Sequence, residues 1–486
     1  MIQSKMYWDG KWQQGQEAET QKVRNPYNGE VVGTIRIAAE HDVVSAIDAA
    51  SIAFSHWSSL PAIERAGYLK KWHELILKNQ ESIAEILTRE QGKPLGESRK
   101  EIMSAARYLE WYAEEAVRVY GETIPSPSMD KRVIVLQQPI GVVAALTPWN
   151  FPGSMVTRKI APALAAGCTV ILKPSSKSPL TAVQLIQMAH EAGIPPGVVN
   201  LVTGKAESIT QILLGDYRVR KVTFTGSTAV GKQILKHAAE SLKRVSLELG
   251  GHAPYLIFED ADIDKAVSGI LQAKLRNGGQ MCVAANRILV HESVCDEFVA
   301  RLRQALKGMR MGDGMDPDVT IGPLIDRKAY EKVQDHVSDA REKGAGLILG
   351  GQGYQEGNNE AGGYFFYPTI LTNIKENMRI MNEETFGPVV AVRRFSSDKE
   401  AINLANASPY GLAAYVFTES LSRGIRMAEL LEYGVIGLND AGPSTTEAPF
   451  GGFKESGLGR EGGHQGISAY LETKMISLRL SAESAQ

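Results

Sequence analysis

The sequence predicts an α/β protein with a doubly wound parallel sheet and a second α/β region. The first observation is a series of five short β-type runs, separated by enough chain for crossover helices: 142–146, 169–173, 198–202, 221–225 and 244–248. The second is a similar series towards the C-terminus: 255–258, 287–290, 346–350, 389–395, 415–418 and 435–439. Because parallel sheets bind ligands beyond the carboxyl ends of their strands, functional side chains are expected where these runs end.

Segments outside the two series have their own periodicity. Apolar residues recur at helical spacing over 42–57 and continue in amphipathic stretches over 62–117, so the first quarter of the chain is expected to be helical. The segments 131–138 and 467–480 alternate like strands. We expect these two strands to pair with something outside their own domain.

Composition excludes several classes of protein. The chain has 486 residues, of which 43% are hydrophobic, and its 53 basic side chains nearly cancel its 55 acidic ones. These values argue against intrinsic disorder and against general electrostatic binding of nucleic acid. The polar start and the lack of a run of about 20 apolar residues predict a soluble cytoplasmic protein without a membrane partner.

Three cysteines are too few for a disulfide framework and suit a reducing compartment. Cys282 lies in RNGGQMC beside glycines and near Arg276, so it is a candidate reactive thiol. Cys168 begins a β-type run and Cys295 lies in an amphipathic helix, and both are expected to be structural.

Two acidic or histidine-containing segments resemble metal sites but lack required ligands. His73 and Glu74 begin like a zinc-protease helix, but Leu77 stands where the second histidine is needed. The segment 260–264 starts like a calcium loop, but Lys265 replaces the required glycine. Helix capping explains the second segment better, and we expect no metal site.

Small and basic residues follow two of the predicted strands. No G-x-G-x-x-G follows the first strand, but Gly226, Ser227 and Gly231 lie where the fourth strand enters a helix. A phosphate could approach the backbone there, although an ordinary tight turn would look the same. Lys173 ends the second strand and could bond a ribose or a phosphate, unless it belongs only to a solvated loop.

Two further polar side chains end strands of the same sheet. Glu248 lies just before a Gly-Gly break, and Asn150 lies between prolines after the first strand. A rigid amide donor suits a developing oxyanion, whereas Glu248 alone could be an exposed turn carboxylate. The fold would bring these strand ends together in one crevice.

These motifs together resemble the aldehyde dehydrogenase superfamily over essentially the whole chain. The matching motifs occur in the order of that family: TPWNFP, KPS, FTGST, LELGG, GQMC, EETFGP and PFGGFKESGLGREGG. The resemblance implies a Rossmann-type cofactor domain, a second α/β catalytic domain and a small β oligomerisation element.

The resemblance implies a catalytic set. Cys282 would be the nucleophile, Glu248 the general base and Asn150 an oxyanion donor, with Lys159 and Glu461 in a proton path. An aldehyde has no leaving group, so a thiolate must first add to it before hydride can leave for the nicotinamide. Water activated by Glu248 would then hydrolyse the thioester.

The resemblance also implies cofactor contacts. Ser176 stands where enzymes of the family that are strict for NAD commonly have a glutamate that repels a 2′-phosphate, and Lys177 adds positive charge. We therefore expect NADP to be preferred over NAD. The cofactor set comprises Thr147, Trp149, Lys173, Ser175, Ser176, Lys177, Gly226, Ser227, Gly231, Leu249, Glu384 and Phe386.

Within the family, the chain is especially similar to succinate-semialdehyde dehydrogenases. Arg158, Arg276 and Ser444 match the residues that hold the distal carboxylate there, although either arginine could instead make an internal salt bridge. Glutarate semialdehyde, other ω-oxo acids, or a sulfonated or phosphonated aldehyde could use the same groups. A coenzyme A-acylating enzyme and a catalytically silent relative are further alternatives.

The resemblance divides the chain into three parts. Residues 1–120 and 140–250 would form the NAD(P)-binding domain, and 251–465 the catalytic domain. Residues 121–139 and 466–486 would form the oligomerisation element, which pairs with a neighbouring subunit. A homodimer or a homotetramer is expected.

Overall fold

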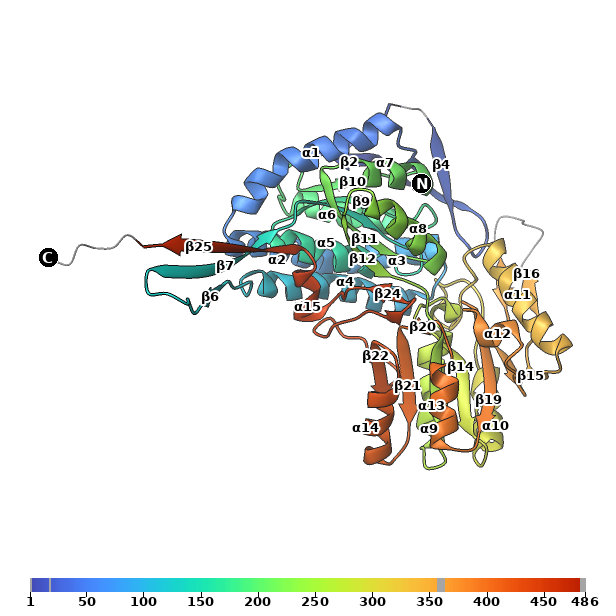
Figure 1. The fold of residues 1–486 in the computed structure, drawn as a ribbon. Coiled ribbons are helices and arrows are strands. Elements are labelled where there is room, and N and C mark those ends of the chain that lie inside the picture. Colours follow the sequence, from blue (N-terminus) through green and yellow to red (C-terminus); the bar gives the residue numbers. More distant parts are fainter. Residues whose placement is uncertain (1, 17–18, 356–362, 481–486) are drawn as a thin grey trace.

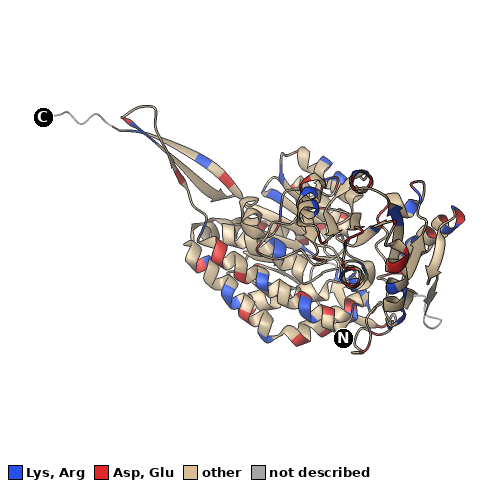
Figure 2. Ribbon diagram, turned by 90° about the horizontal axis from the view of Figure 1, so that it is seen from below, with Lys and Arg blue, Asp and Glu red and all other residues tan. Residues whose placement is uncertain are grey.

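The computed structural model describes residues 2–16, 19–355 and 363–480 of the chain. Two α/β lobes lie against each other, and a narrow β arm projects from the larger one (Figure 1). Figure 2 shows basic and acidic residues mixed along the helices, in keeping with a net charge of −2. None of the described helices is both long enough and apolar enough to cross a membrane.

The larger lobe is built on an eight-stranded sheet. Its five central strands are parallel: β8 (Val142–Leu146), β9 (Thr169–Lys173), β10 (Val199–Leu201), β11 (Val219–Thr225) and β12 (Arg244–Glu248). They correspond to the five predicted runs, which are confirmed. Three short strands complete the edges by antiparallel pairing: β2 (Met6–Trp8), β3 (Lys11–Gln13) and β24 (Gly457–Leu458).

Helices cover both faces of this sheet. One apolar core packs under α2 (Ala62–Lys78), α3 (Gln80–Gln91), α4 (Leu95–Ala116), α5 (Ser154–Ala166) and α6 (Leu180–Glu191). A second packs under α1 (Glu40–Ser59), α7 (Ala206–Gly215) and α8 (Thr228–Ala239). The helices predicted over 42–57 and 62–117 are thus confirmed, whereas the chain before residue 37 forms strands. Because both faces are covered, β8 and β9 are buried along their whole length.

The smaller lobe has a seven-stranded sheet. Its strands are β13 (Ala253–Ile257), β14 (Ala285–His291), β15 (Gly346–Leu349), β18 (Thr369–Thr372), β19 (Val389–Phe395), β21 (Ala413–Phe417) and β22 (Val435–Leu438). All pairs are parallel except β15 with β18. The six predicted runs are strands, and β18 is an addition that the sequence pattern did not predict.

Helices and short turns of helix connect these strands. They are α9 (Ile263–Ile270), a π-helical turn (Leu271–Leu275), a 3₁₀ turn (Arg276–Gly279), α10 (Cys295–Lys307), α11 (Arg327–Glu342), α12 (Arg379–Asn382), α13 (Asp398–Asn406) and α14 (Leu421–Leu430). Asp262 caps α9 by accepting from the amides of Asp264 and Lys265, so the predicted capping role of segment 260–264 is confirmed.

One three-stranded sheet and two strand pairs lie at the surface of the two lobes. They are β1 (Ile2–Gln3), β4 (Thr20–Arg24) and β5 (Val31–Arg36); β16 (Gly353–Gln355) with β17 (Tyr364–Phe366); and β20 (Tyr410–Gly411) with β23 (Phe453–Lys454). Most of them are too short to give a recognisable alternation in the sequence.

The projecting arm is a three-stranded antiparallel sheet. It contains β6 (Glu122–Ile124), β7 (Lys131–Pro139) and β25 (Leu471–Arg479), with β7 in the centre. The strand predicted over 467–480 begins only at Leu471, because α15 (Gly463–Ser468) precedes it. The two predicted strands pair with each other, and pairing of the arm with a neighbouring subunit stays a prediction. The outer edge of β25 has no strand neighbour among the described residues.

Candidate active site

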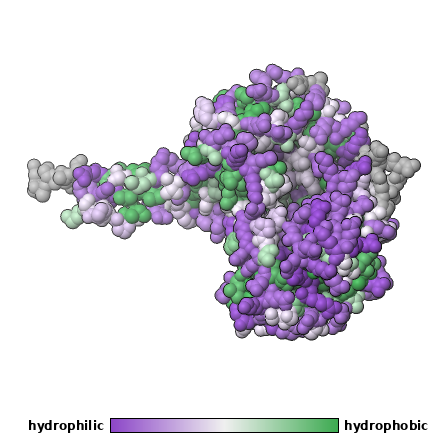
Figure 3. Space-filling view, turned by 45° about the vertical axis from the view of Figure 1, so that its right-hand side comes forward, coloured by the Kyte–Doolittle hydropathy of each residue, from purple (hydrophilic) through white to green (hydrophobic). Residues whose placement is uncertain are grey.

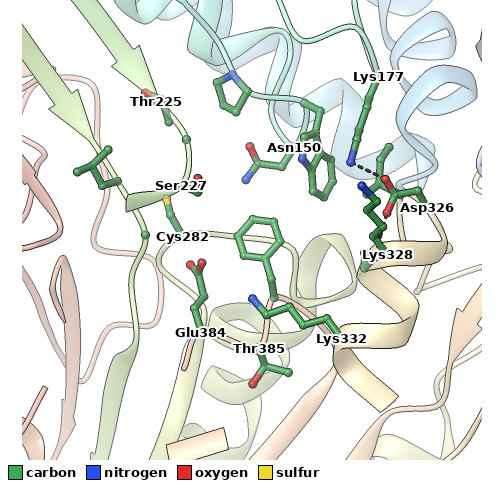
Figure 4. A pocket seen from close by; sticks show the side chains of 18 of the residues that line it. Asn150, Lys177, Thr225, Ser227, Cys282, Asp326, Lys328, Lys332, Glu384 and Thr385 are labelled. Atoms are coloured by element: carbon green, nitrogen blue, oxygen red, sulfur yellow. Dashed lines mark hydrogen bonds and ion pairs between the residues drawn. The ribbon is translucent and has the colours of Figure 1, made fainter. Parts of the chain in front are cut away.

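A pocket of about 310 Å³ lies between the two lobes, at the carboxyl ends of β8, β11 and β12. The larger lobe contributes Asn150 and Ser227, and the smaller lobe contributes Cys282 and Glu384 (Figure 4). The two series of predicted strands therefore bring candidate residues from distant parts of the chain to one crevice, as expected from parallel sheets.

Cys282 lies in the loop between the 3₁₀ turn and β14 and lines this pocket. The loop is tightly folded, since Asn277, Gly278 and Gly279 all have positive φ angles. A Cβ on Gly279 would lie 2.3 Å from the carbonyl oxygen of Gly387, so only glycine fits there. The sequence thus forces a close backbone approach that presents the thiol to the pocket.

The other two cysteines lie elsewhere. Cys168 is buried in the core beneath α2 to α6, and Cys295 is buried in the core of the smaller lobe. Both are structural, as predicted.

Burial and the nearby carboxylates of Glu248 and Glu384 raise the pKa of Cys282 well above its usual value, and Arg158 opposes that rise.

Glu248 ends β12 and is almost fully buried. Neither of its carboxyl oxygens has a hydrogen-bond partner among the described residues. Burial, together with the charge of Glu461, raises the pKa of Glu248 to about 8, although Arg158 and Lys159 act in the opposite direction. Its interaction with the Cys282 thiol also acts to lower the pKa of Glu248. A carboxyl group with this pKa is a stronger base, once ionised, than a carboxylate in solution.

Asn150 is held by its side chain against the Cys282 loop. Its Nδ2 donates to the carbonyl oxygen of Gln280 over 3.1 Å. A primary amide has two N–H groups, so this bond fixes the amide plane and leaves one N–H for another acceptor. Such a fixed donor beside a thiol suits stabilisation of an oxyanion.

Three charged side chains form a buried cluster behind Glu248. Lys159 donates to Glu461, and Arg158 Nε lies 3.0 Å from Glu461 Oε2. The guanidinium of Arg158 also lies 4.0 Å from the centre of the Phe450 ring. Burial acts to raise the pKa of Glu461, but the charges of Lys159 and Arg158 bring it below its usual value. Arg158 thus makes the internal ion pair that the sequence left open as an alternative.

Arg276 and Ser444 line a smaller side pocket next to the Cys282 loop. Met281 and Val283, the neighbours of Cys282, also line it, together with Phe450. In the part of the chain that the structure describes, Arg276 makes no ion pair. The side pocket therefore presents a guanidinium that makes no ion pair, close to the thiol, although the nearby Glu97 carboxyl interacts with its charge.

The predicted cofactor residues fall into two groups. Those that line the main pocket are Trp149, Lys177, Gly226, Ser227, Leu249, Glu384 and Phe386. Thr147, Lys173, Ser175, Ser176 and Gly231 lie beside or behind it, outside its lining. A Cβ on Gly231 would lie 2.3 Å from Leu249, so this glycine allows α8 to pack against Leu249 rather than exposing the backbone to the pocket.

The pocket has the features that a dinucleotide requires. Ser227 caps α8, so the positive end of that helix faces the crevice. The hydroxyls of Thr147 and Thr225 are buried without a hydrogen-bond partner among the described residues. Burial lowers the pKa of Lys173 to about 8. These unpaired donors fit the ribose and phosphate groups of a nicotinamide cofactor.

Glu384 and Phe386 form the opposite wall. Glu384 accepts from the amide of Gly251 over 3.1 Å, and burial raises its pKa to about 7. The Phe386 ring meets Trp149 edge to face, with 5.7 Å between ring centres. Phe386 has a φ of 58°, an uncommon conformation for a bulky residue and one found at ligand sites.

Comparison with known proteins decides the family. A sequence model described as the aldehyde dehydrogenase family matches residues 12–476. The chain belongs to this family. Its motifs, its two α/β lobes and its thiol-containing crevice agree with that assignment, and it is an NAD(P)-dependent aldehyde oxidoreductase.

Individual aldehyde dehydrogenases resemble the chain over nearly its whole length. A 3-sulfolactaldehyde dehydrogenase of Pseudomonas putida is 48% identical, covering 98% of this chain and 97% of that protein. An NADP-dependent succinate-semialdehyde dehydrogenase of Escherichia coli is also 48% identical, covering 97% of each. The crystal structure of an E. coli NADP-dependent enzyme has a TM-score of 0.96 and 48% identity, covering 98% of each chain.

Sequence reasoning missed the part of the pocket that α11 supplies to this aldehyde dehydrogenase. Lys328 and Lys332 line the pocket from α11, as does Asp326, which caps that helix. Asp326 Oδ2 lies 2.5 Å from Lys177 Nζ, so an ion pair joins the two lobes across the pocket (Figure 4). No sequence motif at a strand end precedes α11, so its contribution to the pocket lining is seen only in the folded structure.

Proposed function

We propose that the chain oxidises a short aldehyde with a negatively charged distal group, and that succinate semialdehyde, oxidised to succinate, is its substrate. The observation that carries this proposal is the position of Arg276. Its unpaired guanidinium shares a side pocket with Ser444, beside the neighbours of the nucleophile candidate Cys282. An arginine there can hold a carboxylate by two parallel hydrogen bonds while the aldehyde carbon reaches the thiol.

The chemistry assigned to the residues follows from their surroundings. Cys282, having lost its thiol proton to water, adds as a thiolate to the aldehyde carbon, and the second N–H of Asn150 with the Cys282 amide stabilises the oxyanion. When bound, the nicotinamide supplies the hydride acceptor that turns this adduct into a thioester. Glu248 then takes a proton from water, which releases the acid and restores the thiol. Lys159 and Glu461, in contact behind Glu248, would carry that proton away.

Arg158 has a supporting role in this proposal. Arg158 forms an ion pair with Glu461 and stacks on Phe450, a residue that lines the side pocket. These two contacts hold Arg158 just behind that pocket. From there its charge favours an anionic substrate without a direct bond in this structure.

We further propose that NADP is preferred over NAD. Ser176 carries no negative charge, and its hydroxyl donates to the carbonyl oxygen of Gly204 over 2.8 Å. Lys177, Lys328 and Lys332 add positive charge to the pocket. A similar enzyme of E. coli is named as NADP-dependent, which supports the same preference.

The subunit division is also part of the proposal. Residues 1–120 and 140–250 form the cofactor domain, 251–465 the catalytic domain, and 121–139 with 466–486 the oligomerisation element. One short strand of the catalytic domain, β24, pairs with β12 and so belongs to the sheet of the cofactor domain. The free edge of β25 supports assembly into a homodimer or homotetramer.

A dehydrogenase for glutarate semialdehyde or a sulfonated aldehyde is the second candidate. The side pocket recognises charge more than shape, and a similar protein of Pseudomonas putida is named as a 3-sulfolactaldehyde dehydrogenase. Such substrates would use the same guanidinium.

The test compares succinate, glutarate and sulfonated semialdehydes with uncharged propanal, using both cofactors and scoring kcat/KM. Arg276→Leu should raise KM for succinate semialdehyde about 10- to 100-fold and leave propanal within about 2-fold, since one charged hydrogen-bonded contact is lost. Arg310→Leu, which removes another exposed arginine, is the control. Equal effects of Arg276→Leu on both aldehydes would refute the anion site. Turnover that required coenzyme A would contradict hydrolysis.

A further inference from the structure

A buried ion pair lies behind the Asn150 loop, outside the pocket lining. Lys93, just before α4, bonds Glu101 Oε2 over 2.6 Å and the main-chain oxygen of Asn150 over 2.7 Å. The side chains of Lys93 and Glu101 are 0% and 2% exposed. The ammonium of Lys93 also lies 4.0 Å from the centre of the Phe151 ring. A lysine is rarely buried so completely, so this one needs an explanation.

The same pair also fixes the chain after Asn150. The other oxygen of Glu101 accepts from the amide of Gly153 over 2.8 Å, where α5 begins. Lys93 and Glu101 together therefore hold the turn from Asn150 to Gly153 at both ends.

Asn277 completes the support from the other lobe. Its Nδ2 donates to the main-chain oxygens of Asn150 (3.1 Å) and Gln280 (3.3 Å), and its own side-chain oxygen accepts from Gln91 over 2.9 Å. Gln280 is the residue whose carbonyl accepts from the Asn150 amide. The main chain and the side chain of Asn150 are thus both tied to one buried network.

Stability alone is a poor reason for this network. Replacing a buried ion pair by apolar side chains is often neutral or stabilising, because the desolvation of two charges offsets their attraction. What such a pair does provide is a fixed position for the groups it bonds. An oxyanion donor needs this, since an error of about 1 Å in placement can cost about 100-fold in rate.

We propose that Lys93 is a positioning residue for aldehyde oxidation, which fixes the Asn150 main chain so that the free N–H of its side chain points at the oxyanion formed at Cys282. This inference rests on the proposed role of Asn150. Lys93 itself lines neither the main pocket nor the side pocket, and it acts only through Asn150.

The test is a double-mutant cycle on the rate of cofactor reduction in a single turnover. Lys93→Met should lower that rate about 10- to 100-fold and leave the cofactor dissociation constant within about 2-fold. In an Asn150→Ala background, Lys93→Met should have little further effect, because the donor it positions is already absent. Lys243→Met is the matched control, since Lys243 is another buried lysine that bonds two main-chain oxygens, those of Asp216 and Val219.

A second variant guards against misfolding. Lys93→Met combined with Glu101→Gln removes both charges of the pair and keeps an oxygen for the Gly153 amide, so it should fold and show the same loss of rate. An unchanged rate, or losses that multiply in the Asn150→Ala background, would overturn the inference. If Asn150→Ala itself leaves the rate unchanged, the proposed role of Asn150 fails, and that outcome is distinct from failure of the Lys93 inference alone.

Discussion

Burial, more than any single partner, determines the chemistry of the Glu248 carboxyl. Both of its oxygens lack hydrogen bonds in the described structure, and its side chain is almost fully buried. A buried carboxyl of this kind holds its proton more tightly than one in solution. The same burial that would be costly for folding gives the residue a pKa suited to a general base.

We expect steady-state turnover to rise with pH and to level off above about pH 8. Glu248 acts as a base only when ionised, and its pKa is raised to about 8, so the ionised fraction falls about tenfold per pH unit below that value. The measurement is kcat from about pH 6 to about pH 10 with saturating cofactor and aldehyde.

Glu248→Gln provides the control for this titration. The variant should still give a burst of about one reduced cofactor per subunit, because thioester formation does not need this base, but its later turnover should be slow and should not show the rise near pH 8. A wild-type kcat that is flat over the whole range would contradict the assignment.

At the scale of elements, the regular parts of the fold were predictable and the irregular parts were not. In the large sheet, β8 and β9 have a nearly continuous apolar pattern, and β11 and β12 alternate between apolar and polar residues, so their positions follow from the sequence. β18 has only four residues, Thr369–Thr372, and gives no such pattern. Its place between β15 and β19 depends on contacts between distant segments.

The candidate site divides in the same way. Cys282, Glu248 and Asn150 follow from strand ends and family motifs, and the structure brings their segments to one crevice. The ion pair of Arg158 with Glu461 could only be left as an alternative, because its partners are 303 positions apart in the chain and meet only in the folded structure. The lining of the pocket by α11 has no local signal at all.

The contact between α11 and the loop after β9 leads to a prediction on cofactor choice. Lys177 is paired with Asp326, so part of its charge is neutralised before a cofactor binds. Asp326→Asn keeps a good helix cap and frees Lys177, and we expect it to tighten NADP binding about 2- to 5-fold, the size of an exposed ion pair, with little change for NAD. Lys177→Met should weaken NADP binding by a similar factor.

Fluorescence titration of each variant with NADPH and NADH measures this effect. Asp318→Asn, a charge loss at an exposed site of the same lobe, serves as control. Raising the salt concentration should reduce the difference between Asp326→Asn and wild type, since exposed charges are screened. Equal changes for the two cofactors would mean that Lys177 does not distinguish them.

At the scale of the whole molecule, the arm is the part that a single chain leaves incomplete. Figure 3 shows hydrophobic residues on its surface, far from either lobe. Ile124, Met475 and Leu478 are 41%, 64% and 44% exposed. A sheet of three strands with an uncovered edge and apolar side chains is normally paired or covered in a stable protein.

We therefore expect a second copy of the chain to cover the arm. Met475→Asp together with Leu478→Asp would place two carboxylates on β25, where burial in an interface is costly, and should shift the mass measured by light scattering from an oligomer to a single chain. Ile52→Asp, which changes an apolar residue that is 78% exposed on α1, should leave the mass unchanged. Because the arm stands apart from the crevice, the double variant should still bind cofactor as a monomer. A wild-type protein that is monomeric at every concentration would show instead that the arm stays uncovered.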